Sequence, residues 1–270
     1  MGFLSNEKHC DLAVKAGIHE NSVNRYMQHL RTLVANWAED NEKPIGGPGI
    51  HVELDETSTA SQTFMKSGKA HLRYFRWIGA IQRGTNQLVL APLPVIDQLF
   101  VDKPGKRPTM SGGVAYYQKA ALPRPPPPPP LSKAEARPFL KKFLTPGTAA
   151  RPLLAFADSA PTYGALINPT NKGTPLFGNR AHCFKVSHGK EEWTRIDVCE
   201  ASGRPVKCGT QMIDGAWAHL KKFLAPHHGI PNTAEQQRLW VRQWQWSHSI
   251  SGKNALRVFG DEWRCRDASK

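Results

Sequence analysis

Three aspartates occupy positions from which they could bind metal ions together. Asp55 ends an alternating segment at residues 50–55, and Asp158 ends a short apolar run at residues 153–158. Both segments are predicted strands, and strand ends place side chains at a sheet edge, where a neighbouring helix can bring Asp214 close. Mg²⁺ (or Mn²⁺) prefers oxygen ligands. Two such ions about 4 Å apart can activate water and stabilise the leaving oxygen of a phosphodiester.

Other roles for the same acids stay open at this point, because three acids alone are weakly specific in a chain of this size. Asp55 could be a solvated turn residue, Asp158 a helix N-cap and Asp214 a solvated helical acid. Glu56 is left out of the site, because alternation along a strand points it to the opposite face.

The charge of the chain favours a polyanionic partner. Lys and Arg number 36 against 22 Asp and Glu, a formal net charge of +14. Nucleic acid is the commonest partner for such an excess. No stretch approaches the roughly 20 apolar residues of a membrane span, and the first residues lack the order of a signal peptide. We therefore expect no membrane association and an intracellular location, nuclear in a eukaryote.

The five cysteines indicate buried thiols rather than a metal or disulfide framework. They are scattered and contain no Cys-x-x-Cys pair, which argues against both structural zinc and disulfides. A zinc ion bound by His182, Cys183, Cys199 and Cys208 is the weaker alternative.

Residues 8–38 are predicted to be helical, with a turn at Gly17 and with Asn21 or Ser22 as the cap of the second helix. This pattern is typical of a helix-turn-helix, which would present four polar side chains to the major groove: Asn21, Asn24, Arg25 and Gln28. A plain helical hairpin fits the spacing equally well. In the last helix, Trp240, Trp244 and Trp246 are expected to pack in a core rather than stack on bases.

An antiparallel meander is predicted from three strands at 50–55, 74–81 and 87–93, with a hairpin turn at 83–86. Residues 94–130 then form an exposed insertion, because the proline run at 123–130 is stiff and cannot join a sheet interior. This insertion is a spacer or a ligand for a proline-binding domain. Further elements are expected as follows: a helix from Ser132 to about Leu144, strand and turn material at 182–199, and helices at 210–224 and 234–247.

Several sequence segments, taken in order, give these acids a specific context. They are VELDET at 52–57, RWIGAIQRGT at 76–85, LTPGT at 144–148, FADSA at 156–160, KVSHGK at 185–190 and CGTQMIDGAWAHLKK at 208–222. Together they resemble the IS1595 (ISXO2-like) family of DDE transposases, whose domain is shared by eukaryotic Merlin elements. The resemblance covers about residues 8–250.

The resemblance implies an α/β, RNase H-like fold, in which a mixed sheet is flanked by helices and preceded by the N-terminal helical segment. It implies that Asp55, Asp158 and Asp214 bind two Mg²⁺ (or Mn²⁺) ions and catalyse cutting and joining of DNA strands. His188 and Lys190 would contact DNA, and the protein would act as a homo-oligomer on the double-stranded DNA of the transposon ends. The implied domains are 1–44 for DNA binding, 45–250 for catalysis with the insertion at 94–130, and a tail at 251–270.

Two departures from the family pattern leave other functions open. The third acid of the family is commonly glutamate, and many relatives begin with a zinc ribbon that this sequence lacks. A domesticated, catalytically weak or inactive DNA-binding protein is therefore the main alternative. A nuclease of the same fold without strand joining is the other.

Overall fold

The computed structural model describes residues 9–99, 109–111, 114–116, 128, 130–158, 161–168, 174–187, 192–199, 203–225 and 233–249. The chain divides into two units, residues 1–42 with 235–270 (unit 1) and residues 43–234 (unit 2). Within the described residues, no helix has both the length and the apolar character needed to cross a membrane.

Unit 1 begins with the predicted pair of helices, α2 (His9–Ala16) and α3 (Glu20–Asn41). Gly17 makes the turn with φ +64°, a conformation that glycine adopts without steric cost. The cap of α3 is His19, whose Nδ1 accepts a hydrogen bond from the Asn21 N–H at 3.1 Å. The prediction of Asn21 or Ser22 as the cap was therefore wrong, because the cap lies two residues before Asn21 and the helix begins at Glu20.

Helix α7 (Ala234–Ser249) belongs to unit 1, whereas the sequence analysis grouped it with residues 45–250. Its arginines explain the grouping: Arg242 contacts Glu42 at 3.1 Å and Glu39 at 3.3 Å, and both Arg242 and Glu42 have side chains only 4 % exposed. The tryptophans of α7 (Trp240, Trp244, Trp246) are buried, which confirms core packing.

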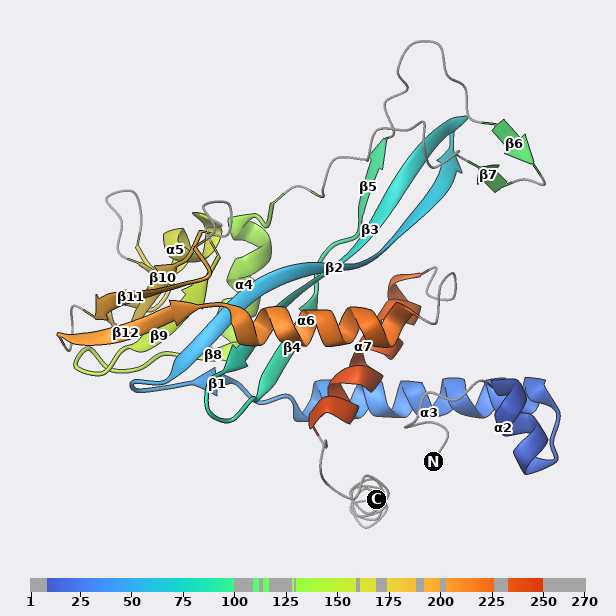
Figure 1. The fold of residues 1–270 in the computed structure, drawn as a ribbon, viewed down its shortest axis with the longest axis horizontal. Coiled ribbons are helices and arrows are strands. Elements are labelled where there is room, and N and C mark those ends of the chain that lie inside the picture. Colours follow the sequence, from blue (N-terminus) through green and yellow to red (C-terminus); the bar gives the residue numbers. More distant parts are fainter. Residues whose placement is uncertain are drawn as a thin grey trace. The chain divides into compact units, whose positions relative to one another are not determined.

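The large sheet of unit 2 has the strand order β10-β9-β2-β3-β4, with β5 also paired to β3 (Figure 1). Its strands are β2 (His51–Lys66), β3 (Lys69–Gln82), β4 (Leu88–Pro92), β5 (Ile96–Leu99), β9 (Leu153–Ala157) and β10 (Ala181–Lys185). The antiparallel meander β2-β3-β4 confirms the prediction. Strands β9 and β10 run parallel to β2, so the sheet is mixed, as expected for the α/β class.

The β2-β3 hairpin is longer than predicted, because β2 continues to Lys66 instead of ending at Asp55. Its turn consists of Ser67 (φ 52°) and Gly68 (φ 73°), and positive φ at both positions matches the twist of a two-residue hairpin. The sequence did not predict this extension, because residues 57–63 are mostly polar and carry little of the apolar alternation of a strand. Within the predicted insertion, β5 joins the sheet, and β6 (Thr109–Ser111) pairs with β7 (Val114–Tyr116). Most of the proline run lies outside the described residues.

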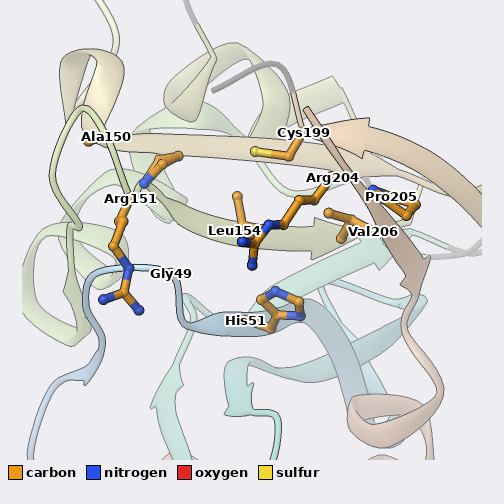
Figure 2. A pocket seen from close by; sticks show the side chains of 10 residues that line it. Gly49, His51, Ala150, Arg151, Leu154, Cys199, Arg204, Pro205 and Val206 are labelled. Atoms are coloured by element: carbon orange, nitrogen blue, oxygen red, sulfur yellow. The ribbon is translucent and has the colours of Figure 1, made fainter. Parts of the chain in front are cut away.

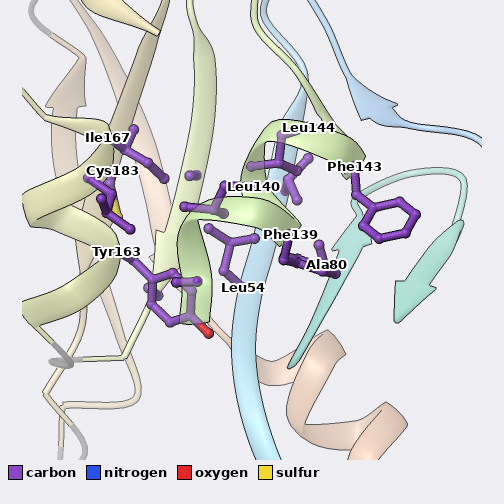
Figure 3. Packing of buried hydrophobic residues seen from close by; sticks show 14 of the residues in the cluster. Leu54, Ala80, Phe139, Leu140, Phe143, Leu144, Tyr163, Ile167 and Cys183 are labelled. Carbon is purple, nitrogen blue, oxygen red and sulfur yellow. The ribbon is translucent and has the colours of Figure 1, made fainter. Parts of the chain in front are cut away.

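One face of the sheet packs on two helices, α4 (Lys133–Phe143) and α5 (Pro161–Ile167). Leu54 and Ala80 from the sheet meet Leu140 and Tyr163 from these helices in the main core (Figure 3). Helix α4 starts with the predicted cap, a capping box between Ser132 and Glu135. Short elements border this layer: β1 (Ile45–Gly46) pairs with β8 (Leu144–Thr145), and η1 (Gly178–Arg180) precedes β10.

The other face carries α6 (Gln211–Leu224) and the hairpin of β11 (Thr194–Cys199) and β12 (Arg204–Gly209). Leu154 and Phe156 of β9 pack there against Val206 and Cys208 of β12. Side chains alternate along a strand, so each strand of the sheet contributes to both layers. Cys183, Cys199 and Cys208 are buried free thiols, as predicted, whereas Cys10 is exposed, contrary to the prediction, and Cys265 lies outside the described residues.

Replacing Arg242 should destabilise unit 1. Arg242→Ala removes the cation that faces Glu42 and Glu39 at a buried position, and such a loss costs about 3 kcal/mol or more. Urea denaturation followed by tryptophan fluorescence measures the change. Arg25→Ala, at an exposed position of α3, is the control and should change stability by no more than about 0.5 kcal/mol. Equal stability of the two variants would contradict the buried ion pair.

Candidate active site

Asp55 and Asp158 lie at the same end of two neighbouring parallel strands. Strands β2 and β9 pair in parallel, and the last pair in their register is Leu54 with Ala157. Asp55 and Asp158 each follow that pair by one residue, so the two acids come from adjacent strands. Asp158 directly follows the last residue of β9, and alternation places Asp55 on the same face as Glu53. That face is the one covered by α6 and β12.

A buried carboxylate holds the first turn of α6 against this face. Glu53, 1 % exposed, accepts hydrogen bonds from the backbone N–H groups of Met212 at 2.8 Å and Ile213 at 3.1 Å. These groups have no partner inside the helix, and the N-terminal end of the helix dipole favours a negative charge. Glu53 therefore fixes the start of α6. Glu53 precedes Asp55 by only two residues in β2.

Arg83 completes this anchor from the turn after β3. Its Nε donates to Glu53 Oε1 at 2.8 Å, and its two other nitrogens donate to the carbonyls of Lys207 at 2.6 Å and Gly209 at 2.8 Å. The guanidinium also lies over the Phe156 ring, 4.0 Å from its centre. We call Glu53, Arg83 and the N-terminal turn of α6 the Glu53–Arg83 clamp. It joins β2, β3, β9, β12 and α6.

The missing side chain of Gly79 lets α6 approach the sheet closely. Gly79 pairs with Asp55 across β2 and β3. A Cβ at this position would lie 2.7 Å from the Trp217 ring and 2.9 Å from the Leu90 side chain. Trp217 follows Asp214 by three residues, so the two lie on neighbouring turns of one helix face. The packing of Trp217 on Gly79 therefore brings Asp214 towards the end of β2.

The acids act on one another electrostatically. The pKa of Asp55 is raised to about 8, first by burial and then by the negative charges of Glu56, Asp158 and Asp214. Thr210 donates its hydroxyl to Asp214 Oδ2 at 3.0 Å. The sequence-predicted acids thus share one electrostatic environment.

Glu56 lies on the opposite face, as alternation predicted, yet it belongs to the same electrostatic group. Its Oε2 accepts a hydrogen bond from the Tyr163 hydroxyl at 3.0 Å. Burial raises its pKa, and the charge of Asp158 raises it further.

The described acids do not form a preorganised metal-binding site. Within the described residues, no group of three or more His, Cys, Asp or Glu side chains is arranged so that it could hold a metal ion. The same finding covers the alternative zinc ligands, His182 with the three buried cysteines.

The predicted DNA contacts are separate from the acids in the chain. On α3, Asn21, Arg25 and Gln28 are exposed and Asn24 is half-buried. His188 and Lys190 lie outside the described residues. Glu53 and Arg83 were not among the predicted site residues. Glu53 could have been recognised, because it is an acid inside an apolar strand, on the same face as Asp55, and a buried carboxylate needs a partner.

Comparisons with known proteins give little further information. No family model matches the chain, and no curated protein matches it. Among solved structures, the Drosophila P element transposase strand transfer complex is similar with a TM-score of 0.22 and 12 % identity. The match covers 84 % of this chain, and this chain spans 55 % of that one. A TM-score of this size does not establish a shared fold.

Removing the charge of Glu53 should loosen α6. Glu53→Gln sets an amide N–H against either Arg83 or the N–H groups of α6, so we expect a loss of about 3 kcal/mol in the free energy of unfolding. Chemical denaturation measures it. The control is Asp197→Asn, which breaks an ion pair with Arg195 whose side chains are both 39 % exposed; it should cost less than about 1 kcal/mol. Similar costs for both variants would show that the clamp is not a stabilising contact.

Asp55 should make the protein less stable as pH rises. Its pKa is raised in the folded state, so the folded chain keeps a proton that the unfolded chain releases. The stability it contributes is complete below its unfolded pKa and is lost as pH rises towards 8, by up to about 1.4 kcal/mol per pH unit. Denaturation curves recorded in EDTA, between the unfolded pKa of Asp55 and pH 8, should show this decrease of the free energy of unfolding with pH in the wild type. The decrease should be smaller in Asp55→Asn. Parallel pH profiles would contradict the assignment.

Proposed function

We propose that the chain is a DNA transposase of the DDE type, a metal-dependent polynucleotidyl transferase, and that unit 2 is its RNase H-like catalytic domain. The strand order supports the fold: three antiparallel strands are followed by two parallel ones, with helices on both faces. One observation carries the function. Asp55 and Asp158 follow the last residue pair of two parallel strands, and the charges of Asp158 and Asp214 both act on Asp55.

Two Mg²⁺ (or Mn²⁺) ions would be held by Asp55, Asp158 and Asp214. Burial, and after it the negative charges of Glu56, Asp158 and Asp214, raise the pKa of Asp55 to about 8, and a bound cation would favour the charged form of this group. When bound, the ions would activate water or a 3′-hydroxyl and stabilise the leaving 3′-oxygen. The protein itself orients the carboxylates: the Glu53–Arg83 clamp fixes the start of α6, and the packing of Trp217 on Gly79 sets its height above the sheet.

DNA binding is proposed for both units. The net charge of +14 favours a polyanion. On α3, the exposed Asn21, Arg25 and Gln28, with the half-buried Asn24, would contact DNA, and His188 and Lys190 would contact the substrate. Assembly as a homo-oligomer on the transposon ends, a nuclear location in a eukaryote and membership of the IS1595 (ISXO2-like) family are parts of the same proposal.

A DNA-binding protein without catalysis is the second candidate, and the state of Asp214 favours it. The carboxylate of Asp214 accepts a hydrogen bond from the buried Thr210. Aspartate is also one methylene shorter than the glutamate common in the family. The hydrogen bond engages one carboxylate oxygen of Asp214, and the shorter side chain reaches less far towards a metal ion.

Substitution of Asp214 separates the two candidates. In the active enzyme, Asp214→Ala should abolish Mg²⁺- or Mn²⁺-dependent cleavage of duplex DNA from the regions flanking the coding sequence. DNA affinity should stay equal or rise slightly, because the change removes a negative charge. Gel analysis of end-labelled DNA and fluorescence anisotropy measure the two properties. Asp97→Ala, which removes an acid paired with Arg73, is the control and should cleave like the wild type.

Asp214→Glu gives the sharper comparison. It restores the longer side chain, so it should be tolerated and should raise the rate if Asp214 reaches its ion poorly. An inactive wild type that gains cleavage in Asp214→Glu would indicate a decayed transposase. Inactivity of both proteins would favour the DNA-binding candidate. Full activity of Asp214→Ala would show that another residue is the third ligand, and Glu200 and Asp197 are the next candidates.

A further inference from the structure

Beyond the central part of the sheet, strands β2 and β3 continue as a long two-stranded ribbon (Figure 1). Strand β9 pairs with β2 only as far as Leu54, and β4 pairs with β3 only as far as Trp77. Strands β2 and β3 stay paired up to Lys66 and Lys69, and β5 flanks part of β3. From Trp77 to Lys69 this part is about 27 Å long at the rise of a strand. We call residues 57–77 the ribbon.

The basic residues of the ribbon lie on one of its two faces. Residues directly opposite each other in an antiparallel pair point to the same side, and Lys66 pairs in this way with Lys69. Phe64 pairs with His71, and alternation along the strands puts both pairs on one side. Arg73 joins them, two positions beyond His71 along β3. We call these five side chains the basic face.

The opposite face of the ribbon is buried, so the basic face is the one that can meet a partner. Leu72 and Tyr74 point to the buried side and are only 6 % and 7 % exposed. At the turn between the strands, Lys66 and Lys69 are both exposed. The ribbon is therefore anchored through apolar side chains and presents two cations at its tip.

The base of the basic face is electrically neutral. The Arg73 guanidinium lies over the Phe64 ring, 4.6 Å from its centre, and it binds Asp97 of β5, with Nε 2.8 Å from Oδ1. Residues 57–76 contain no Asp or Glu. Because Arg73 and Asp97 neutralise each other, the excess positive charge of this face is that of Lys66 and Lys69.

A second group of cations in unit 2 lies in a recess. A cavity of about 650 Å³ opens between the start of β2 and the β11-β12 hairpin, and Arg151 and Arg204 contribute to its lining (Figure 2). A cavity of this size accepts a small ligand but no duplex. Between it and the aspartates, Glu53 and Phe156 are buried beneath Arg83. Of the two basic surfaces, the ribbon is the one open to a large polyanion.

The shape and charge of the ribbon suit duplex DNA. The major groove, about 12 Å wide, admits a two-stranded β-ribbon. Lysine ammonium groups bind phosphates as point charges, and such contacts release counterions from the DNA. Because Lys66 and Lys69 are exposed at the end of the ribbon, they can approach phosphates without any change in the core.

We propose that the ribbon binds in the major groove of duplex DNA, with Lys66 and Lys69 contacting backbone phosphates. The inference rests on the proposed function for the choice of DNA as the polyanion. Since phosphate contacts carry no sequence information, this contact anchors the DNA without reading its sequence. It is separate from the contacts proposed for α3.

The test measures binding of labelled duplex DNA by fluorescence anisotropy in EDTA, so that it does not depend on cleavage. Lys66→Gln and Lys69→Gln should each weaken binding about three-fold, and their combination about ten-fold, on unrelated sequences alike. The glutamine double variant should also lower the slope of log K against log salt by about 1.8, because two phosphate contacts are lost. Lys66→Arg combined with Lys69→Arg keeps the charge and should keep both affinity and slope.

Lys133→Gln combined with Lys141→Gln is the matched control, because both lysines are exposed on α4. It removes the same charge from unit 2 and should change the affinity less than about two-fold. Circular dichroism and thermal unfolding establish that all variants are folded. An equal loss in the control, or wild-type binding in the glutamine double variant, would overturn the proposal. An equal loss in the arginine double variant would overturn it too, because charge would then not be the cause.

Chemical probing tests the groove and the class of partner. In the wild-type complex, guanine N7, which faces the major groove, should be protected from dimethyl sulfate. The glutamine double variant should lose part of this protection, and unchanged protection would contradict the proposed groove. Loss of binding to polyglutamate with unchanged DNA binding would overturn the proposal and indicate an acidic protein as the partner.

The ribbon contact and the proposed function can fail separately. Asp214→Ala should keep the salt slope of the wild type, because Asp214 is not on the ribbon. Absence of DNA cleavage by the wild type would refute the proposed function and leave the ribbon's binding result standing. Cleavage that depends on Asp214, together with wild-type binding in the glutamine double variant, would refute the ribbon contact alone.

Discussion

The buried carboxylate of Glu53 is the interaction on which the arrangement of unit 2 depends. A charge at 1 % exposure is tolerated only when several hydrogen bonds compensate its lost hydration. Here Arg83 and two backbone N–H groups of α6 supply them. Since Arg83 also binds the carbonyls at the end of β12, one charged group joins the sheet, the hairpin and the helix. Moving α6 would leave a buried charge without partners.

This anchor explains how several acids can lie near one another in the folded protein. Burial raises the pKa of Asp55 to about 8, and the negative charges of Glu56, Asp158 and Asp214 add to this effect. The positions of the acids are therefore set by other contacts. Strand pairing sets Asp55 beside Asp158, and the clamp with Gly79 and Trp217 sets the helix that carries Asp214.

The two faces of the sheet are used for different purposes by the same strands. Leu54 and Ala80 join the apolar core with α4 and α5. Their neighbours Glu53, Asp55 and Gly79 face α6, where charge and close approach matter more than apolar burial. At the opposite end of this polar face lies the cavity with Arg151 and Arg204. The face thus carries negative charge at one end and positive charge at the other.

The sequence by itself determined the elements whose signals are local. The meander, the strand before Asp158, the capping box at Ser132 and the amphipathic α6 follow from alternation, periodicity and capping chemistry, and the structure confirms each. The polar half of β2 was missed because residues 57–63 carry little apolar alternation, and tertiary pairing with β3 overrode that local preference. Only the tertiary structure decided that α7 belongs with α3, that Glu53 caps a helix about 160 residues later in the chain, and that Arg151 and Arg204 meet in one cavity. Such contacts join residues far apart in sequence, so no local pattern encodes them, and their energies depend on burial that exists only in the folded chain.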